Sequence, residues 1–438
     1  MGYAEWAHGP FGLDAQRGQT LHYQRTVLVV VHTVTAGTRL NDVVPLLEAD
    51  RRIQVVFTYA PSALIAGGVQ EFLARLGGVV VPWAQATQTR FDLALAASDG
   101  LLEWVHAPVL TLRHGIGYTK YPAQWDGDGV ETRRAVAGPE PARLISHGRT
   151  IAAAIVLPTR WQEQMLRRSC PEAAPIAVVA GDPCFDRLSA SLRAREAYRR
   201  ALGIAGKKLV AVSSTWGPGS LLCTQPALLA ELADQLPRER YQLAAIIHPG
   251  VWHWHGPRQI QAWYADCVRR GLILIPPDEG WRAVVAAADA VIGDHGSVTC
   301  YAAAAGIPVL LAYSADGEVV PGSPIAILGE IAPRLRHDAP YTTQVEHAVS
   351  AWSPQQHAKI RDLVTDVPGQ SANIIRSIMY RLMKLPEPVE GARIWPVPVP
   401  RPFAVAETFG QQWLSPVRLG WWRASRPRSS YGGTHLTL

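Results

Sequence analysis

The sequence predicts an α/β protein made of two Rossmann-like, doubly wound domains that face each other across a cleft. Short, almost fully apolar runs alternate with helical segments along most of the chain, which is typical of parallel sheets covered by helices on both faces. This alternation occurs twice, before and after a charged helical stretch at residues 187–206. A polar turn at residues 294–297 lies between an apolar strand and a small-residue helix, at a strand end where such sheets bind ligands.

The composition is that of a globular protein with more than one domain. The chain has 438 residues, of which 48% are hydrophobic and 18% charged, so two or three domains with sizeable cores are expected. The formal net charge is +6, and the basic residues are spread along the chain, which does not favour a nucleic-acid partner. No apolar run reaches the roughly 18 residues that a membrane-spanning helix needs.

The cysteines and the N-terminal residues predict a cytoplasmic protein. The five cysteines have no CxxC spacing, and an odd number in a long chain is typical of reduced, intracellular thiols. The first residues, MGYAEWAHGPFGLD, lack a basic segment followed by an apolar run, so no signal peptide is expected. Residues 386–438 contain Pro, Trp and Arg and are predicted to form an extended tail, for which a peripheral contact with an anionic membrane surface is an alternative role.

Residues 25–186 are predicted to form the first domain, after an N-terminal arm at residues 1–24. Its helices are expected at residues 40–48, 69–76 and 159–168. Its strands are expected at residues 25–34, 53–59, 77–81, 91–96, 109–112, 150–157 and 174–179.

Residues 207–370 are predicted to form the second domain, which the charged connector at residues 187–206 joins to the first. Its strands are expected at residues 208–213, 241–247, 272–275, 290–293 and 309–312. Its helices are expected at residues 225–236, 254–270, 281–288 and 298–305. A strongly apolar crossover helix is predicted at residues 371–385, before the tail.

Several common nucleotide-binding and catalytic motifs are absent from the sequence. There is no GxxxxGK[ST] motif, which disfavours a P-loop kinase, and no GxGxxG after the first strand, which disfavours a nicotinamide enzyme. There is also no GxSxG nucleophile elbow. His253 and His255 have no acidic or Cys partner nearby, so neither a metal nor a resident cofactor is predicted.

In the first domain, a candidate site follows the apolar strand at residues 109–112. His114 is placed to act as a general base on a hydroxyl, because a neutral imidazole accepts a proton near neutral pH. Gly115 lets the backbone approach a ligand, and Arg113 and Lys120 carry charges that suit a phosphate. The alternative is that His114 only hydrogen-bonds the loop backbone.

In the second domain, three strand ends carry candidate residues. His248, before Pro249, follows the second strand and is expected to donate to a phosphate or to protonate a leaving group. The remaining candidates follow the first and fourth strands, and we expect them to bind the diphosphate of a nucleotide donor: Ser214, Thr215, Trp216, Gly217, Asp294, His295, Gly296, Ser297, Val298 and Thr299. Within this set, Trp216 is expected to stack on the base of the donor. The structural alternatives are an N-cap for Ser297, a turn residue for Asp294, a plain turn at residues 212–217, and a buried His with satisfied hydrogen bonds for His248.

These motifs resemble those of the two-domain GT-B transferases, and especially of the CDP-glycerol:polyglycerophosphate glycerophosphotransferase family. The resemblance covers roughly residues 25–385 and rests on four segments. The segments are the His114-Gly115 turn followed by Lys120, the GDPxFDRL stretch at residues 181–188, His248-Pro249, and the block at residues 288–309 that contains Asp294 and Ser297. The chain differs from the family at His295-Gly296, where Tyr-Ser is usual, and at Ile247, where a basic residue is common.

The resemblance implies the fold, the chemistry and the partners. It makes the first domain the acceptor side, with His114 as the base, and the second domain the donor side, with His248 at the donor phosphate. The predicted function is therefore metal-independent transfer of a glycerophosphoryl or glycosyl group from a nucleotide-activated donor to an acceptor hydroxyl, on an acceptor that a polyprenyl or glycan carrier would hold. The alternatives are a nucleotide-sugar epimerase or hydrolase, and a non-catalytic scaffold of the same fold.

Overall fold

The computed structural model describes most of the chain, and its described residues form one compact unit. The described residues are 6–12, 20–63, 67–121, 123–125, 131–133, 139–204, 206–314 and 316–402. Parts of the expected N-terminal arm and the expected tail beyond residue 402 therefore lie outside the described residues. Among the described helices, none combines the length and the apolar character needed to cross a membrane.

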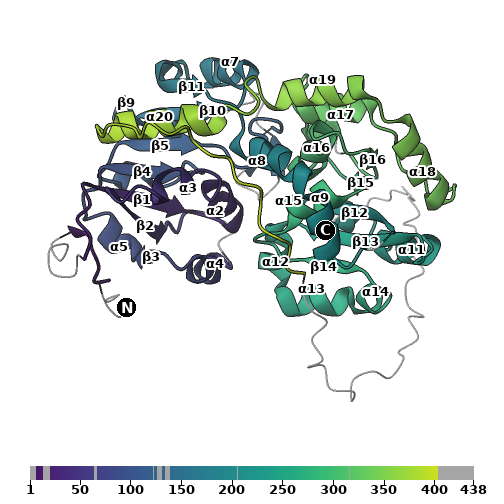
Figure 1. The fold of residues 1–438 in the computed structure, drawn as a ribbon. Helices are drawn as coiled ribbons and strands as arrows, with labels where there is room; N and C mark the ends of the chain where they lie inside the picture. The colour runs from purple at the N-terminus through teal and green to yellow at the C-terminus, as the bar shows by residue number, and fades with distance from the viewer. Residues whose placement is uncertain are drawn as a thin grey trace, which may run out of the picture. The chain divides into compact units, whose positions relative to one another are not determined.

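The first half of the chain forms a seven-stranded sheet in the order β11-β10-β5-β4-β1-β2-β3, and all neighbouring strands are parallel (Figure 1). Strands β2 and β3 are added on one side of β1, and the later strands are added on its other side, beginning with β4. The crevice beyond the ends of β1 and β4 is where sheets of this kind bind ligands. The strands are β1 (Arg25–Val31), β2 (Ile53–Tyr59), β3 (Val79–Val81), β4 (Leu93–Ala96), β5 (Val109–Leu112), β10 (Ala154–Leu157) and β11 (Ala177–Val179). Two small hairpins are β6 (Ala123–Trp125) with β7 (Glu131–Arg133), and β8 (Ile145–Ser146) with β9 (Arg149–Thr150).

Helices cover both faces of this sheet because β1 is apolar on both sides. Val27, Val29 and Val31 pack against α2, α3, α4 and α20, whereas Leu28 and Val30 pack on the opposite face with α5 and η2. The helices of this half are α2 (Val34–Leu40), α3 (Pro45–Glu48), α4 (Val69–Leu76), α5 (Trp83–Ala86), η2 (Leu102–Trp104), α6 (Pro141–Leu144), α7 (Arg160–Ser169), η3 (Pro171–Ile176) and, from the end of the chain, α20 (Ser371–Met383).

The second half forms a five-stranded parallel sheet in the order β14-β13-β12-β15-β16 (Figure 1). The same change of side lies between β12 and β15, so both sheets repeat the same topology. The strands are β12 (Lys208–Ser214), β13 (Tyr241–Ile247), β14 (Ile273–Ile275), β15 (Ala290–Gly293) and β16 (Val309–Leu311). The finding confirms the predicted fold class of two doubly wound α/β domains.

The helices of the second half lie on two faces of its sheet. The first group packs with Leu209 and Ala211: α8 (Pro183–Ser191), η4 (Leu192–Ala194), α9 (Arg195–Ala201), α15 (Trp281–Ala287), α16 (Ser297–Ala304), α17 (Pro324–Ile331) and α19 (Pro354–Val364). The second group packs with Val210 and Val212: α10 (Leu221–Thr224), α11 (Leu228–Gln235), α12 (Pro249–His255), α13 (Pro257–Trp263), α14 (Ala265–Arg269) and α18 (Tyr341–Ala351). A short 3-10 helix, η5, spans Asp316–Glu318.

The chain crosses between the halves at three places, and the last is a segment of residues 386–402 without helix or strand, which we call the strap. At its start Glu387 accepts a hydrogen bond from Arg376 of α20 at 2.7 Å. Further along, the Val397 N–H donates to Ser191 at 2.9 Å, and the buried Val397 side chain joins the core of the second half. The expected tail thus begins as an ordered segment.

Several expected elements differ from the structure. The helix expected at residues 40–48 is the end of α2 followed, after a turn, by α3, and the strand expected from residue 174 begins at Ala177 after η3. Two further differences have clear local reasons. The first strand was expected to reach residue 34, but it ends at Val31 because the Thr33 side chain accepts from the Ala36 N–H and starts α2. The single helix expected at residues 254–270 is three short helices. It is interrupted at Gly256, whose φ is +76°, before Pro257, and again at Tyr264.

Candidate active site

A cavity of about 300 Å³ lies where the carboxyl ends of strands from both sheets meet. Both predicted histidines line it, one from each half of the chain. The other predicted residues on its wall are Gly115, Lys120, Ser214, Thr215, Trp216, Gly296, Ser297 and Val298. The structure therefore brings together candidates that are up to 184 positions apart in the sequence, between residues 114 and 298.

His114 follows β5 and is held in one tautomer by its neighbour at the end of β4. Its Nδ1 lies 3.0 Å from the carbonyl oxygen of Ala97, and because a carbonyl only accepts, Nδ1 carries the proton. The other ring nitrogen, Nε2, is thus a lone-pair acceptor. The cavity reaches the ring, yet protein surrounds it, and this loss of hydration lowers the pKa of His114, with Arg113 and Arg39 acting in the same direction. His114 is therefore neutral at pH 7 and able to accept a proton.

His248 has the opposite tautomer. It is the N-cap of α12, and its Nδ1 accepts a hydrogen bond from the Gly250 N–H at 2.9 Å. Nε2 must then carry the proton, which makes it a hydrogen-bond donor. Burial, with smaller contributions from His114 and Lys120, lowers the pKa of His248 to about 3. The ring is neutral at pH 7, and Trp216 stacks near it with 6.2 Å between ring centroids.

The start of α16 meets the loop that carries His114. The Ile116 N–H points to Ser297 Oγ at 3.4 Å, and a Cβ placed on Gly115 would lie 2.7 Å from the same oxygen. Gly115 has a φ of +65°, a backbone conformation that favours glycine, and a side chain there would displace the Ser297 hydroxyl. The first backbone N–H groups of α16, which have no preceding turn to accept their hydrogen bonds, lie beside this contact.

Lys120 reaches the second half of the molecule from the first. Residue 120 forms an isolated antiparallel bridge with Val319, and the Tyr121 N–H donates to the Glu318 carbonyl at 3.0 Å. The Lys120 charge also contributes to the pKa shifts of His248 and Asp294. Lys120 was assigned from the sequence to the acceptor side, and its charge acts on residues of the donor side.

Five of the sequence-predicted residues lie outside the cavity wall. Asp294 is fully buried and accepts from the backbone N–H groups of Thr215, Leu221 and Gly296, so it holds the loops behind the wall together. Thr299 is also fully buried and packs on Gly293. His295 is buried near Tyr313. Gly217 lies in a turn with a φ of +87°, and Arg113 forms an ion pair with Asp99.

Sequence reasoning missed a buried network in the wall that joins the two halves. Arg39 of α2 donates to Asp182 at 2.7 Å, to the Gly115 carbonyl at 2.7 Å and to the Tyr301 hydroxyl of α16 at 2.6 Å. The Tyr301 hydroxyl itself lies 2.7 Å from Asp182. Asp182 also caps α8 by accepting from the N–H groups of residues 184 and 185. These contacts fix the backbone next to His114.

A second missed cluster lies at the turn after α2. Asp42 accepts from Arg282 of α15 and, at 2.9 Å, from Arg187 of α8. Arg282 also pairs with Glu279 at 3.0 Å, and its side chain is 1% exposed. The charged residues of this cluster are isolated in the sequence and form no motif. Only their buried ion pairs in the structure show that they join the two halves.

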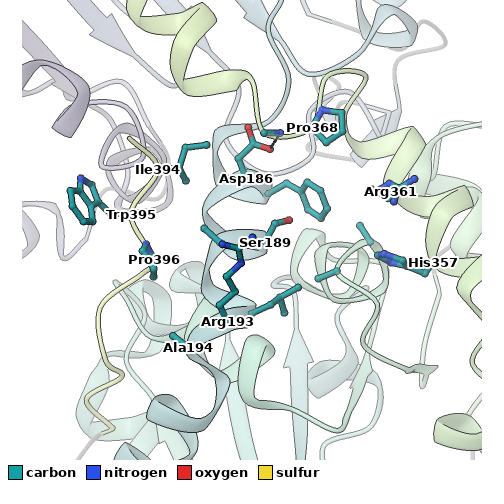
Figure 2. A pocket seen from close by; sticks show the side chains of 16 residues that line it. Asp186, Ser189, Arg193, Ala194, His357, Arg361, Pro368, Ile394, Trp395 and Pro396 are labelled. Atoms are coloured by element: carbon teal, nitrogen blue, oxygen red, sulfur yellow. Dashed lines mark hydrogen bonds between the residues drawn. The ribbon is translucent and has the colours of Figure 1, made fainter. Parts of the chain in front are cut away.

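A second cavity, larger at about 790 Å³, is a separate groove. Figure 2 shows its floor on α8, with α19 on one side and the strap on the other. None of the sequence-predicted site residues lines it, and Asp186 in its wall is already bonded to Gly369 at 2.7 Å and to Ser371. We therefore place the candidate site in the smaller cavity. Among the described residues there is no group of three or more His, Cys, Asp or Glu side chains that could hold a metal ion.

The two facing sheets, with their repeated topology and a cavity at the carboxyl ends of both, define the GT-B fold. Solved structures support this class. The wall teichoic acid polymerase TagF aligns with a TM-score of 0.53 at 12% identity, over 83% of this chain and 90% of that chain. A TagF variant soaked with CDPG aligns with a TM-score of 0.54 at 13% identity, over 83% of this chain and 89% of that chain.

HepE of Anabaena, in complex with UDP and glucose, aligns with a TM-score of 0.45 at 13% identity, over 82% of this chain and 100% of that chain. No protein-family model matches the sequence, and no curated protein matches it. At these identities the likeness to the two TagF structures establishes the fold alone, and that fold resembles the teichoic acid polymerase as the sequence motifs predicted.

Proposed function

We propose that the chain is a GT-B transferase that moves a glycerophosphoryl or glycosyl group from a nucleotide diphosphate donor to an acceptor hydroxyl. The observation that carries this proposal is the pair of neutral histidines on one cavity, one per half, in opposite tautomers. His114 offers a lone pair to a hydroxyl proton, and His248 offers an N–H to a phosphate oxygen. A transfer between an acceptor alcohol and an activated phosphate needs both.

In the proposed reaction, the acceptor hydroxyl gives its proton to Nε2 of His114 as its oxygen bonds to the transferred group. That group is attacked at the phosphorus of a glycerophosphoryl donor or at the anomeric carbon of a glycosyl donor. The bond between this atom and the leaving phosphate oxygen breaks, and its electron pair stays on the nucleotide. Lys120, the His248 N–H and the first N–H groups of α16 stabilise the negative charge of the leaving phosphate. The proposed reaction uses no metal.

The donor-binding part of the proposal predicts a nucleotide-dependent rise in thermal stability. We expect one of CDP, UDP, GDP, TDP or ADP to raise the melting temperature, because a ligand that binds only the folded state stabilises it by mass action. Lys120→Met should weaken that nucleotide about tenfold to a hundredfold, the range for losing one charged hydrogen bond. Lys359→Met, on the exposed face of α19, is the matched control and should leave the affinity unchanged. A flat response to all five nucleotides would contradict the proposal.

The lowered pKa of His114 predicts an unusual pH profile. A general base works in its neutral form, so activity is present above the pKa of His114 and is lost as pH falls through it. Because burial lowers that pKa below its ordinary value of 6.5, the acid limb of kcat/KM should have its midpoint below pH 6.5. The measurement is kcat/KM from pH 4.5 to 8 with the donor found above. An acid limb at or above pH 6.5 would exclude His114, as it is placed here, as the base.

Product analysis separates the proposed transfer from the related reactions of the same fold. With the donor alone, an epimerase or hydrolase forms product, whereas the proposed transferase releases nucleotide only when an acceptor hydroxyl is added. Formation of an epimer or a free sugar without acceptor would replace the proposal by one of those activities.

A further inference from the structure

The separate groove of about 790 Å³ lies between α8, α19 and the strap (Figure 2). Among the described residues, none lines both this groove and the cavity that holds His114 and His248. Its volume falls within the roughly 300–1,000 Å³ that is usual for small-molecule sites. The groove is therefore a second place on the molecule where a ligand fits, and it can be filled while the candidate active site is also occupied.

Most of the groove wall is apolar. Phe185 of α8 and Ala304 of α16 are buried and give the groove a closed apolar floor. Ile394 and Pro396 of the strap line the other side. A hydrocarbon chain that enters this groove leaves water and contacts apolar side chains, and burial of this kind favours binding in proportion to the area covered.

Two polar side chains of the wall are already engaged within the protein. The Asp186 carboxylate accepts from the Gly369 N–H at 2.7 Å and from both the N–H and the hydroxyl of Ser371. The Nδ1 of His357 lies 3.2 Å from the Ala303 carbonyl oxygen, which holds the ring against α16. These two groups shape the groove, and their hydrogen bonds stabilise the protein itself.

The groove keeps one cation that has no partner. Arg361 of α19 is paired with Asp362 at 2.9 Å. Arg193 of η4 is exposed, and among the residues that the structure describes no group pairs with its guanidinium. In Figure 2 its side chain runs along α8 toward Ser189, between the strap and α19. The groove thus combines an apolar floor with one available positive charge.

From this combination we infer that the groove binds an amphiphilic monocarboxylate, with its carboxylate on Arg193 and its hydrocarbon chain on the apolar floor. A guanidinium forms two parallel hydrogen bonds with a planar carboxylate. One available positive charge matches the single charge of a carboxylate better than the roughly 1.5 to 2 negative charges of a phosphate monoester at pH 7. The inference is independent of the proposed transferase activity, since neither His114 nor the nucleotide takes part.

The test is a calorimetric titration of the full chain with decanoate, at concentrations below those at which it forms micelles. We expect one decanoate to bind per chain. Octanoate is two CH₂ groups shorter and should bind on the order of tenfold more weakly, because each buried CH₂ contributes about fourfold. Decanol carries the chain without the charge, and decyl phosphate carries it with a different anion, so both should bind more weakly than decanoate.

Variants of Arg193 test the position of the carboxylate. Arg193→Met removes the charge and keeps an unbranched side chain, so it should weaken decanoate about tenfold to a hundredfold, the range for losing a charged hydrogen bond. Arg193→Lys keeps the charge without the planar fork and should lose only part of that affinity. Arg200→Met is the matched control, because it removes an exposed arginine of α9 outside the groove and should leave the affinity unchanged.

Several results would overturn the inference. Equal affinity for decanol would show that the charge has no role, and tighter binding of decyl phosphate would show that the anion is of another class. An unchanged affinity in Arg193→Met, or no binding of decanoate at all, would remove the site from this groove.

Competition with the nucleotide of the thermal screen separates this inference from the proposed function. The nucleotide should not displace decanoate, and displacement would place decanoate in the candidate active site and contradict the inference. If a nucleotide binds but decanoate does not, the groove site is wrong and the transferase proposal stands. If decanoate binds through Arg193 but no nucleotide binds, the groove site stands and the transferase proposal fails.

Discussion

Replacing His114 with alanine is expected to lower turnover about a hundredfold to ten-thousandfold, the usual contribution of a general base. Nucleotide affinity should stay within about twofold of wild type, because the proposed phosphate contacts come from Lys120, His248 and α16. The measurement pairs kcat for transfer with a direct titration of the nucleotide. This split between turnover and binding is what distinguishes a base on the acceptor side from a residue that holds the donor.

The matched control is His357→Ala. His357 belongs to α19, lies 3.2 Å from the Ala303 carbonyl through Nδ1, and lines the separate groove of Figure 2. It should keep wild-type turnover, so a loss specific to His114 cannot be attributed to removing an imidazole in general. Wild-type rates in His114→Ala would remove this residue from the chemistry, and an equal loss of nucleotide affinity would move it to the donor site.

Much of the fold is predictable from the sequence, because buried parallel strands must be apolar on both sides. Ile53–Tyr59 and Tyr241–Ile247 begin and end where the apolar runs predicted. Helix boundaries are harder to predict from the sequence, because single capping residues determine where a helix begins. Thr33 starts a helix that contains a glycine and three β-branched residues, and such a segment has little helical propensity of its own.

The candidate site was predictable only where residues follow strands directly. His114 and His248 stand at strand ends, and the topology of parallel sheets brings such positions to one edge. Arg39 and Tyr301 lie inside helices 262 positions apart and meet only after both halves have folded. Asp294, in contrast, stands at a strand end but its side chain turns inward to three backbone N–H groups, so position alone did not predict where it points.

The buried network around Arg39 ties the two halves together, and its loss is expected to have the largest effect on stability. Arg39→Met should reduce the free energy of unfolding by about 3–5 kcal/mol, because it leaves the Asp182 carboxylate buried without its cation. The replacement also removes one hydrogen bond from the Gly115 carbonyl and one from the Tyr301 hydroxyl. The measurement is urea unfolding, with the free energy obtained from the midpoint and slope of the same transition.

Two further variants test whether the cost comes from an unpaired buried charge. Arg336→Met removes an arginine from an exposed pair with Asp338 and should leave the urea midpoint almost unchanged. Adding Asp182→Asn to Arg39→Met should recover part of the lost stability, since it removes the stranded carboxylate while keeping its shape. If the double variant is no more stable than Arg39→Met, the loss comes from packing and from the hydrogen bonds to Gly115 and Tyr301. If Arg39→Met costs no more than Arg336→Met, the network does not hold the halves together.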